Sequence, residues 1–252
     1  NKIKIEKAIS FPHSLGLLYS AFTYFTGFKV NSGEYKLMGL APYGEPTFAD
    51  LIKKELIDIK PDGSYRMNMK YFSYPDGLRM TGQAFSELFG GPPRSAESEI
   101  SQREMDLAAS IQAVTEEVMM LTARHIQKVT KTKHLVLAGG VALNCVSNGR
   151  LLREGPFDDI WIQPAAGDAG GALGAALFCW HQLLENPRKG TGKDVQKGSL
   201  LGPKYTTAEC KALCDEKGAK YHVLDEPALL ELVAGKMADG KVVGWMHGRM
   251  EY

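Results

Sequence analysis

Cysteine, net charge and long apolar runs are all scarce in this sequence. Four cysteines among 252 residues are too few for a disulfide framework, so we expect reduced thiols. The longest apolar runs fall well short of the roughly 20 residues that a membrane helix needs, and no secretory leader is recognisable. A formal net charge of +1 provides no long-range field to attract nucleic acid. These absences predict a cytoplasmic protein that binds neither membranes nor nucleic acid.

The remaining composition is that of a folded protein: 44% of the residues are hydrophobic and 23% are charged. The length corresponds to one large domain, or to one domain and part of another. Residues 186–204 are polar, basic and poor in bulky side chains, which is typical of a linker. The sequence starts at Asn1 and stops at Tyr252, directly after a predicted strand. We therefore expect a fragment of a longer protein.

Local patterns predict helices and strands along the whole chain. Residues 3–8 alternate like an edge strand, residues 15–25 read as a buried helix, and residues 73–100 as an irregular excursion. Segments 56–60 and 65–69 flank a Pro-Asp-Gly-Ser turn, which indicates a hairpin. Ser101 and Glu104 form a capping box at the start of an amphipathic helix that should reach about residue 130.

A strand–glycine turn–helix–strand pattern then indicates the fold class. It consists of a strand at 134–138, a helix at 141–153 and a strand at 159–163, before a helix ending near 184. Such a βαβ unit has parallel strands, and α/β proteins bind ligands at the carboxyl ends of these strands. Beyond the linker, a second α/β unit is predicted to contain helices at 207–217 and 227–238 and strands at 221–224 and 241–246.

The first candidate site is the turn after the strand at 134–138. Gly139 and Gly140 would let the backbone approach a ligand, and the free N–H groups of the following helix favour an anion. The side chain of Asn144 suits an adenine edge or a ribose hydroxyl. The alternative is a tight turn that binds nothing.

The second candidate is the turn after the strand at 159–163. Asp168 lies there among residues too small to cover it, including Gly167 and Gly170. Its carboxylate could cap the helix, or it could be an oxygen ligand of a divalent metal beside a phosphate. The glycines favour close approach of a ligand or of another backbone.

A third cluster combines Gly33, Glu34 and Lys36. Lys36 could reach a phosphate and Glu34 could bond a ribose, whereas the alternative is a solvated ion pair between the two. The six histidines have no HxxxH or HExxH spacing, so this chain by itself predicts no complete zinc or iron site.

Four ordered motifs, at residues 12–23, 30–44, 138–145 and 163–174, closely resemble the O-carbamoyltransferases, and residues 244–252 resemble the start of a fifth. That family includes nodulation-factor and antibiotic-modifying enzymes. The resemblance implies an α/β fold with two parts. Residues 1–185 would be the second half of an actin-like (ribonuclease H-like) ATPase domain, with a mixed sheet and flanking helices. Residues 205–252 would open a truncated YrdC-like domain.

The resemblance also implies a chemistry. The full-length enzyme would convert carbamoyl phosphate and ATP to carbamoyladenylate and transfer the carbamoyl group to the hydroxyl of a glycoside or antibiotic-like acceptor. Two sets of residues match nucleotide-binding positions of the family: Gly33, Glu34 and Lys36, and the turn that holds Gly139, Gly140 and Asn144. Asp168, between Gly167 and Gly170, matches a ligand of a divalent metal, expected to be iron, whose histidine ligands would lie upstream of residue 1.

Several alternatives stay open. A sugar-kinase-like phosphotransferase would share the glycine turn, and a non-catalytic nucleotide-binding module would keep the fold without the chemistry. The predicted unit after the linker favours the carbamoyltransferase. We expect the isolated fragment to be inactive, residues 73–100 to face the acceptor, and a homodimer as the default oligomer.

Overall fold

The computed structural model describes residues 3–190 and 192–251. The chain divides into two compact units, Asn1–Pro187 and Arg188–Tyr252. The division falls at the start of the segment predicted as a linker.

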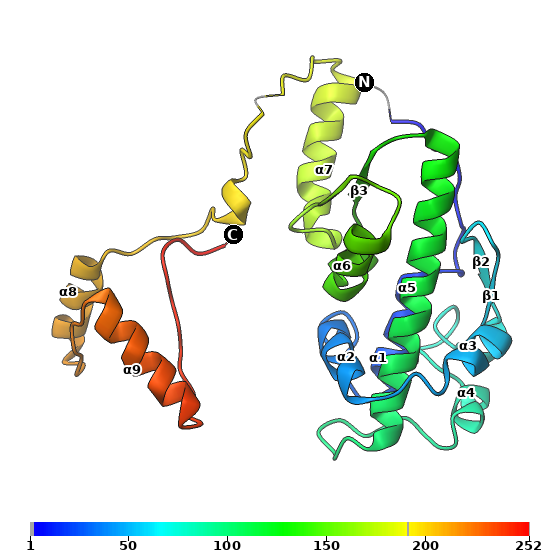
Figure 1. Cartoon of the computed structure of the whole chain (residues 1–252), viewed down its shortest axis with the longest axis horizontal. Coiled ribbons are helices and arrows are strands. Elements are labelled where there is room, and N and C mark those ends of the chain that lie inside the picture. Colours follow the sequence, from blue (N-terminus) through cyan, green and yellow to red (C-terminus); the bar gives the residue numbers. More distant parts are fainter. Residues whose placement is uncertain (1–2, 191, 252) are drawn as a thin grey trace. The chain divides into compact units, whose positions relative to one another are not determined.

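A single long helix, α5 (Gln102–Thr130), organises the first unit (Figure 1). Ser101 and Glu104 form the predicted capping box at its start. Its buried positions Leu107, Ile111 and Val114 recur every three to four residues, so one stripe of the helix faces the core. The helix ends at Lys131, which adopts a left-handed backbone with φ 57°. Both predicted ends of this helix are confirmed.

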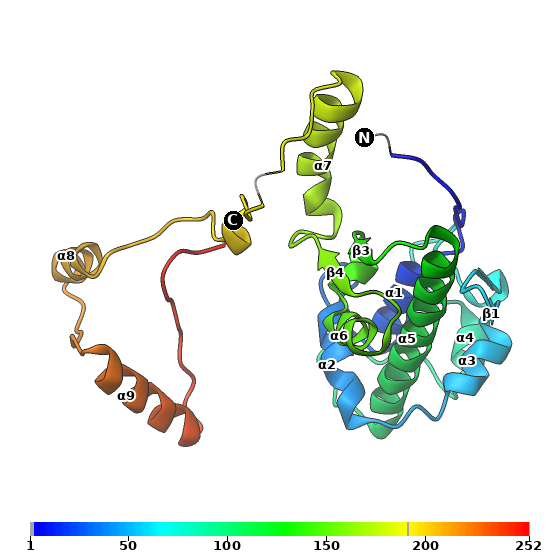
Figure 2. The same ribbon diagram turned by 45° about the horizontal axis from the view of Figure 1, so that its top comes forward.

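Shorter elements cover α5 on two sides. Helices α1 (Leu15–Phe25) and α2 (Glu34–Leu40) lie on one side and α3 (Ala49–Glu55) and α4 (Gln83–Leu88) on the other (Figures 1 and 2). The predicted hairpin is present as the antiparallel strands β1 (Ile57–Ile59) and β2 (Tyr65–Met67). Fully buried phenylalanines of α1 and α4 meet edge to face, with the ring centroids of Phe25 and Phe85 4.8 Å apart.

The predicted βαβ unit is confirmed. Strands β3 (His134–Leu137) and β4 (Asp159–Ile162) pair in parallel, and α6 (Cys145–Glu154) connects them. The predicted helix start at residue 141 is wrong by four residues, because a 3₁₀ turn, η3 (Gly140–Leu143), comes first. A small cluster of Met120, Ala123, Leu151 and Phe157 packs this unit against α5. Because β3 and β4 are parallel, their carboxyl ends lie at the same edge of the pair.

The helix that follows β4 is apolar yet exposed. A short 3₁₀ turn, η4 (Asp168–Gly170), leads into α7 (Gly171–Phe178), and a π-helical turn continues to Leu183. Every residue of α7 is exposed, Phe178 to 53%.

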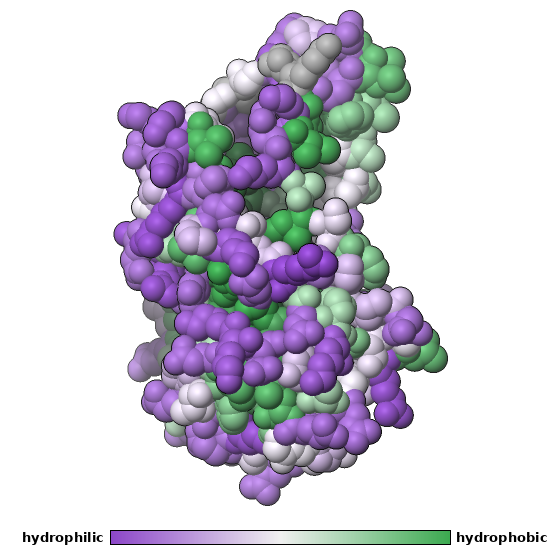
Figure 3. All heavy atoms as spheres, turned by 90° about the vertical axis from the view of Figure 1, so that its right-hand side faces the viewer, coloured by the Kyte–Doolittle hydropathy of each residue, from purple (hydrophilic) through white to green (hydrophobic). Residues whose placement is uncertain are grey.

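The face of the molecule drawn in Figure 3 is mostly hydrophilic. Its hydrophobic side chains lie in several separate places.

Several predicted strands are wrong. Residues 3–8 are exposed and form no strand. The second unit contains α8 (Thr207–Lys217) and α9 (Glu226–Ala238), as predicted, but residues 221–224 and 241–246 form no strand. Strands satisfy their backbone groups only by pairing, and among the described residues of this unit the one bridge joins Lys204 to Arg249.

The predicted α/β class is confirmed in its coarse form. In place of one mixed sheet, residues 3–190 and 192–251 contain two separate two-stranded sheets, one antiparallel and one parallel. The hairpin strands pair with each other across a tight turn, which leaves β3 and β4 as a pair of their own. The actin-like and YrdC-like identities stay predictions. Within the same ranges, no helix is both long enough and apolar enough to cross a membrane.

Candidate functional site

The two turns predicted to bind ligands lie against each other at the carboxyl edge of the β3–β4 pair. The backbone N–H of Gly139 donates to the carbonyl of Ala166 over 2.6 Å. A methyl group added at Gly167 would lie 3.6 Å from Leu143. The structure thus brings together the segments 139–144 and 165–170, which are more than 20 residues apart in the chain.

The first turn requires glycine for its own backbone. Gly139 has φ +101°, a conformation that other residues rarely adopt. Apart from the adjoining residues, no atom lies within 4 Å of a Cβ placed at Gly139 or Gly140, and both residues are exposed. A ligand could therefore approach this backbone, but the conformation alone already accounts for the glycine at 139. Both interpretations of the turn stay open.

The side chain of Asn144 has a structural role. Its Oδ1 accepts from the backbone N–H of Ser147 over 3.0 Å, which caps the start of α6. It also accepts from Nε2 of Gln112 over 3.1 Å, while its Nδ2 donates to Oε1 of Gln112 over 2.9 Å. Asn144 is 8% exposed and Gln112 is 5% exposed. The oxygen of Asn144 is thus fully used inside the protein, and one N–H remains for a ligand.

A polar network extends from this pair through the core. Tyr19 of α1 donates to Oε1 of Gln112 over 3.0 Å, and Gln112 donates to Glu116 over 2.8 Å. Burial, followed by the nearby carboxylates of Glu34 and Glu116, raises the pKa of Tyr19 far above its usual range. The phenol therefore stays protonated and keeps its role as a donor. The network fixes the turn at 139–144 to α1 and α5.

The third predicted cluster lies at the start of α2, beside the same network. Gly33 is buried, and a side chain there would collide with the carbonyl of Lys29 at 2.6 Å, so chain packing alone requires glycine. Oε1 of Glu34 accepts from Ser20 over 2.8 Å and from the N–H of Asn31 over 3.0 Å. Within the described residues Glu34 forms no ion pair with Lys36, so that alternative is wrong. Lys36 is exposed.

The candidate metal ligand, Asp168, is exposed at the start of η4. The glycine at 170 is required by the turn itself, since a Cβ there would lie 2.1 Å from the carbonyl oxygen of Ala165. In residues 3–190 and 192–251, no group of three or more His, Cys, Asp or Glu side chains gathers to hold a metal. These residues therefore fit one ligand of a metal site and do not form a complete site.

Three residues of this region were not predicted from the sequence. Gln112 lies within the long amphipathic helix α5. A polar residue on the buried stripe of such a helix could have indicated a buried hydrogen-bond network. Ser147 and Asn148, in the first turn of α6, are 2% and 6% exposed. Oγ of Ser147 and Oδ1 of Asn148 have no hydrogen-bond partner among the described residues. Such unpartnered buried atoms at a helix start are what a polar ligand would satisfy.

Comparison with known families assigns most of this chain to one of them. Residues 1–177, more than two thirds of the chain, match the family described as "Carbamoyltransferase N-terminus". The chain belongs to this carbamoyltransferase family. The turns at 139–144 and 165–170 and the start of α2 all lie within the matched region.

Individual relatives agree with the family assignment. This carbamoyltransferase-family chain is 57% identical, over its whole length, to an uncharacterized protein of Synechocystis sp. and spans 41% of that protein. It is 35% identical to nodulation protein NolO of Bradyrhizobium diazoefficiens, over 98% of this chain and 43% of the relative. It is 23% identical to the 3'-hydroxymethylcephem-O-carbamoyltransferase of Amycolatopsis lactamdurans, over 86% of this chain and 36% of that enzyme. The chain thus spans about two fifths of these relatives.

Proposed function

We propose that the intact protein containing this chain is an ATP-dependent O-carbamoyltransferase. Carbamoyl phosphate and ATP would be its substrates, and a hydroxyl-bearing small molecule would be its acceptor. One observation carries the proposal: in a chain of the carbamoyltransferase family, two of the three turns expected to bind a ligand lie against each other at the carboxyl edge of the β3–β4 pair. This edge is where α/β proteins commonly bind their ligands.

The proposed reaction has two steps. In the first step, water hydrolyses carbamoyl phosphate to phosphate and carbamate. An oxygen of the carbamate then attacks the α-phosphorus of ATP, which forms carbamoyladenylate and releases pyrophosphate. The acceptor hydroxyl then attacks the carbamoyl carbon. A new C–O bond forms, the bond to AMP breaks, and the hydroxyl proton leaves to a base. Following the family resemblance, we assign activation to a YrdC-like part and transfer to an actin-like part.

Residues of this chain would bind and orient the adenylate. The exposed backbone at Gly139 and Gly140 lets a nucleotide approach closely. The unpartnered Oγ of Ser147 and Oδ1 of Asn148 would bond its polar groups. Lys36 is exposed on α2 and could neutralise a phosphate. The Tyr19–Gln112–Asn144 network would hold the turn in place.

A divalent metal, expected to be iron, is part of the proposal. When bound, such an ion would polarise a carbonyl or phosphoryl oxygen. Asp168 would supply one oxygen ligand. Because the described residues contain no group of three or more His, Cys, Asp or Glu side chains that could hold a metal, we assign no step of the reaction to it.

The proposal is tested by incubating the intact protein with carbamoyl phosphate and ATP. We expect release of pyrophosphate that depends on carbamoyl phosphate. Formation of ADP with a sugar, without this release, would identify a phosphotransferase instead. The isolated chain of 252 residues should release no pyrophosphate.

The metal assignment has a separate test. Asp168→Asn in the intact protein should lower the metal content measured by elemental analysis, because an amide is a weaker ligand than a carboxylate. Asp159→Asn is the matched control, since Asp159 is also exposed but begins β4 at the opposite end. Equal metal content in both variants would remove Asp168 from the site.

A further inference from the structure

The first motif of the sequence, residues 12–23, contains a histidine that the proposed function does not use. His13 lines a groove of about 480 Å³, together with residues of α3, β1 and β2. None of the residues of the candidate adenylate site lines this groove. The groove is therefore a second place on the first unit where polar groups of several elements meet.

Neighbouring hydrogen bonds hold His13 in place. The hydroxyl of Tyr74 donates to the carbonyl of Pro12 over 2.7 Å, and the N–H of Leu15 donates to the hydroxyl of Tyr65 over 2.9 Å. The backbone on both sides of His13 is thus attached to the hairpin and to the segment that follows it.

One hydrogen bond of the ring determines its tautomer. The backbone N–H of Met67 donates to Nδ1 of His13 over 3.2 Å. Because a backbone N–H can only donate, Nδ1 is the unprotonated nitrogen, and the proton of the neutral ring is on Nε2. His13 is half-buried, and its Nε2 has no hydrogen-bond partner within the described residues. The ring therefore offers one N–H donor in a fixed orientation.

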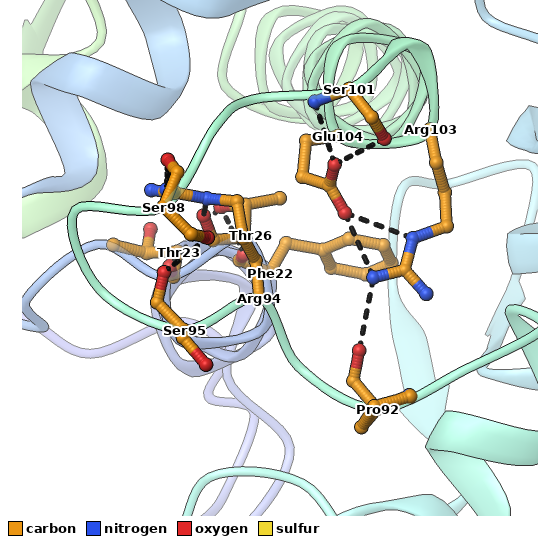
Figure 4. A network of polar contacts seen from close by, with 10 residues as sticks. All are labelled: Phe22, Thr23, Thr26, Pro92, Arg94, Ser95, Ser98, Ser101, Arg103 and Glu104. Atoms are coloured by element: carbon orange, nitrogen blue, oxygen red, sulfur yellow. Dashed lines mark hydrogen bonds and ion pairs between the residues drawn. The ribbon is translucent and has the colours of Figure 1, made fainter.

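Arg66 of β2 also lines the groove, and its guanidinium is free. Figure 4 shows an arginine of the same unit that is engaged: Arg103 pairs with Glu104 over 2.8 Å and donates to the carbonyl of Pro92 over 2.9 Å. Arg66, in contrast, is exposed, and its side chain forms no hydrogen bond or ion pair in the described part of the chain. It lies opposite Asp58 in the hairpin without pairing with it. The N–H groups of Arg66 therefore remain for a ligand.

The two carboxylates in the lining of the groove already have partners. Oδ2 of Asp58 pairs with Lys60 over 2.7 Å. Oε2 of Glu55 accepts from the hydroxyl of Tyr71 over 2.9 Å, and its Oε1 pairs with Lys54 over 3.7 Å. Since a lysine balances each carboxylate, the guanidinium on β2 is a positive charge in excess.

The free donors of the groove define the chemistry of a ligand. A guanidinium binds a carboxylate or a phosphate through two parallel N–H bonds. The N–H of a neutral imidazole adds a third donor toward an oxygen. A cation would meet only carboxylates that lysines already balance. The groove thus favours a small anion that carries a carboxylate or phosphate group.

We propose that His13 and Arg66 bind a small oxyanion in this groove. The inference goes beyond the proposed function and does not depend on it. Hydrogen bonds fix the N–H of His13 before the anion arrives, so binding orders little on that side of the groove. Arg66 supplies the charge.

The test is a titration of the intact protein with inorganic phosphate, followed by ³¹P NMR at constant ionic strength. Saturable binding is expected. Arg66→Gln should raise the Kd about tenfold or more, because a charge-assisted pair of hydrogen bonds is lost. Its melting temperature should not change, because the side chain is exposed and unpaired. Acetate as a competitor distinguishes the two kinds of ligand: acetate that displaces phosphate at a lower concentration than phosphate itself identifies a carboxylate site, and weaker displacement identifies a phosphate site.

Two substitutions of His13 separate binding from support of the fold. His13→Asn keeps an acceptor at the position of Nδ1 and lacks the donor at Nε2. It should raise the Kd for phosphate about 5-fold without lowering the melting temperature. His13→Gln keeps a donor near the position of Nε2 and takes the acceptor away from Met67. It should lower the melting temperature and bind phosphate more tightly than His13→Asn.

Arg124→Gln is the matched control for the loss of charge. Arg124 is exposed on α5 and does not line the groove. Phosphate should bind this variant as it binds the unaltered protein. Equal weakening by Arg66→Gln and Arg124→Gln would show a general effect of charge and overturn the site. Absence of phosphate binding, or a Kd for His13→Asn equal to that of the unaltered protein, would overturn it as well.

Discussion

The pair formed by Asn144 and Gln112 leads to a quantitative prediction about stability. These two amides exchange hydrogen bonds of 2.9 and 3.1 Å in the core, where both residues are nearly inaccessible to solvent. We expect Asn144→Ala and Gln112→Ala each to destabilise the first unit, and the double variant to lose less than the sum of the two. Each substitution alone takes two hydrogen bonds away from a partner that stays buried, whereas the double variant removes both partners.

The magnitudes follow from the bonds that are lost. Asn144→Ala removes the cap on Ser147, which costs about 1 kcal/mol, and leaves Gln112 partly unpaired, which costs about 1–3 kcal/mol more. Gln112→Ala also removes the partner of Tyr19 and creates a cavity, so we expect a loss of about 3–5 kcal/mol. The coupling energy between the two substitutions should be about 1–2 kcal/mol.

The assay is urea unfolding, followed by tryptophan fluorescence in a Trp245→Phe background. The remaining tryptophans, Trp161 and Trp180, then both report on the first unit. Gln102→Ala is the matched control, because Gln102 begins the same helix but is exposed and bonds only Asp106 at the surface. It should change the free energy of unfolding by less than about 0.5 kcal/mol.

A coupling energy within about 0.3 kcal/mol of zero would refute the reasoning, since contacting residues should couple more strongly. The prediction also bears on the site. Asn144→Ala will weaken nucleotide binding whether or not the side chain touches the nucleotide, because the turn loses its support. Only the affinity of the folded fraction, compared with that of Gln112→Ala, separates direct contact from loss of support.

Two further predictions concern the hairpin and the buried capping box. Gly63→Ala should lower the free energy of unfolding by about 2–4 kcal/mol, because Gly63 has φ +79° and a Cβ there would lie 2.3 Å from the backbone of Thr122. Gly90 has a similar φ but open space around it, so Gly90→Ala should lower the free energy of unfolding by about 1 kcal/mol in the same urea titration. Similar losses in the two variants would contradict a collision with Thr122. Burial would raise the pKa of Glu104, but hydrogen bonds from Ser101 and Arg103 outweigh it and hold that pKa below its usual range. This stabilisation is complete above the usual carboxyl pKa and is lost as the pH falls through the lowered pKa of Glu104. Glu104→Gln keeps the cap but cannot ionise, so in this variant the stability should fall less steeply with pH on the acid side. An unchanged acid side of the stability curve would exclude Glu104 as the cause of that fall.

The parts of the fold that were predictable from sequence depend on local interactions. The capping box at Ser101 and the apolar stripe of α5 specify a helix through contacts within a few residues. The hairpin follows from its turn residues, and the βαβ unit from the alternation of short apolar strands and glycine turns. None of these features needs a distant partner to be recognised.

The strand predictions are wrong where no neighbouring strand is present to pair with the segment. Residues 221–224 and 241–246 have strand-like composition, but a strand needs a neighbour to satisfy its backbone, and none pairs with them in the described part of the second unit. The exposed apolar helix α7 presents the same problem in another form. Its composition predicts burial, but burial requires a surface that the helix itself does not supply.

For the candidate site, sequence alone determined which turns carry glycines and which polar residues lie beside them. Both features depend only on residues that are close together in the chain. Only the tertiary structure decided that the N–H of Gly139 bonds the carbonyl of Ala166, and that the oxygen of Asn144 is used by Ser147 and Gln112. Whether a polar atom is free for a ligand depends on every neighbour that packs around it, and those neighbours come from distant parts of the chain.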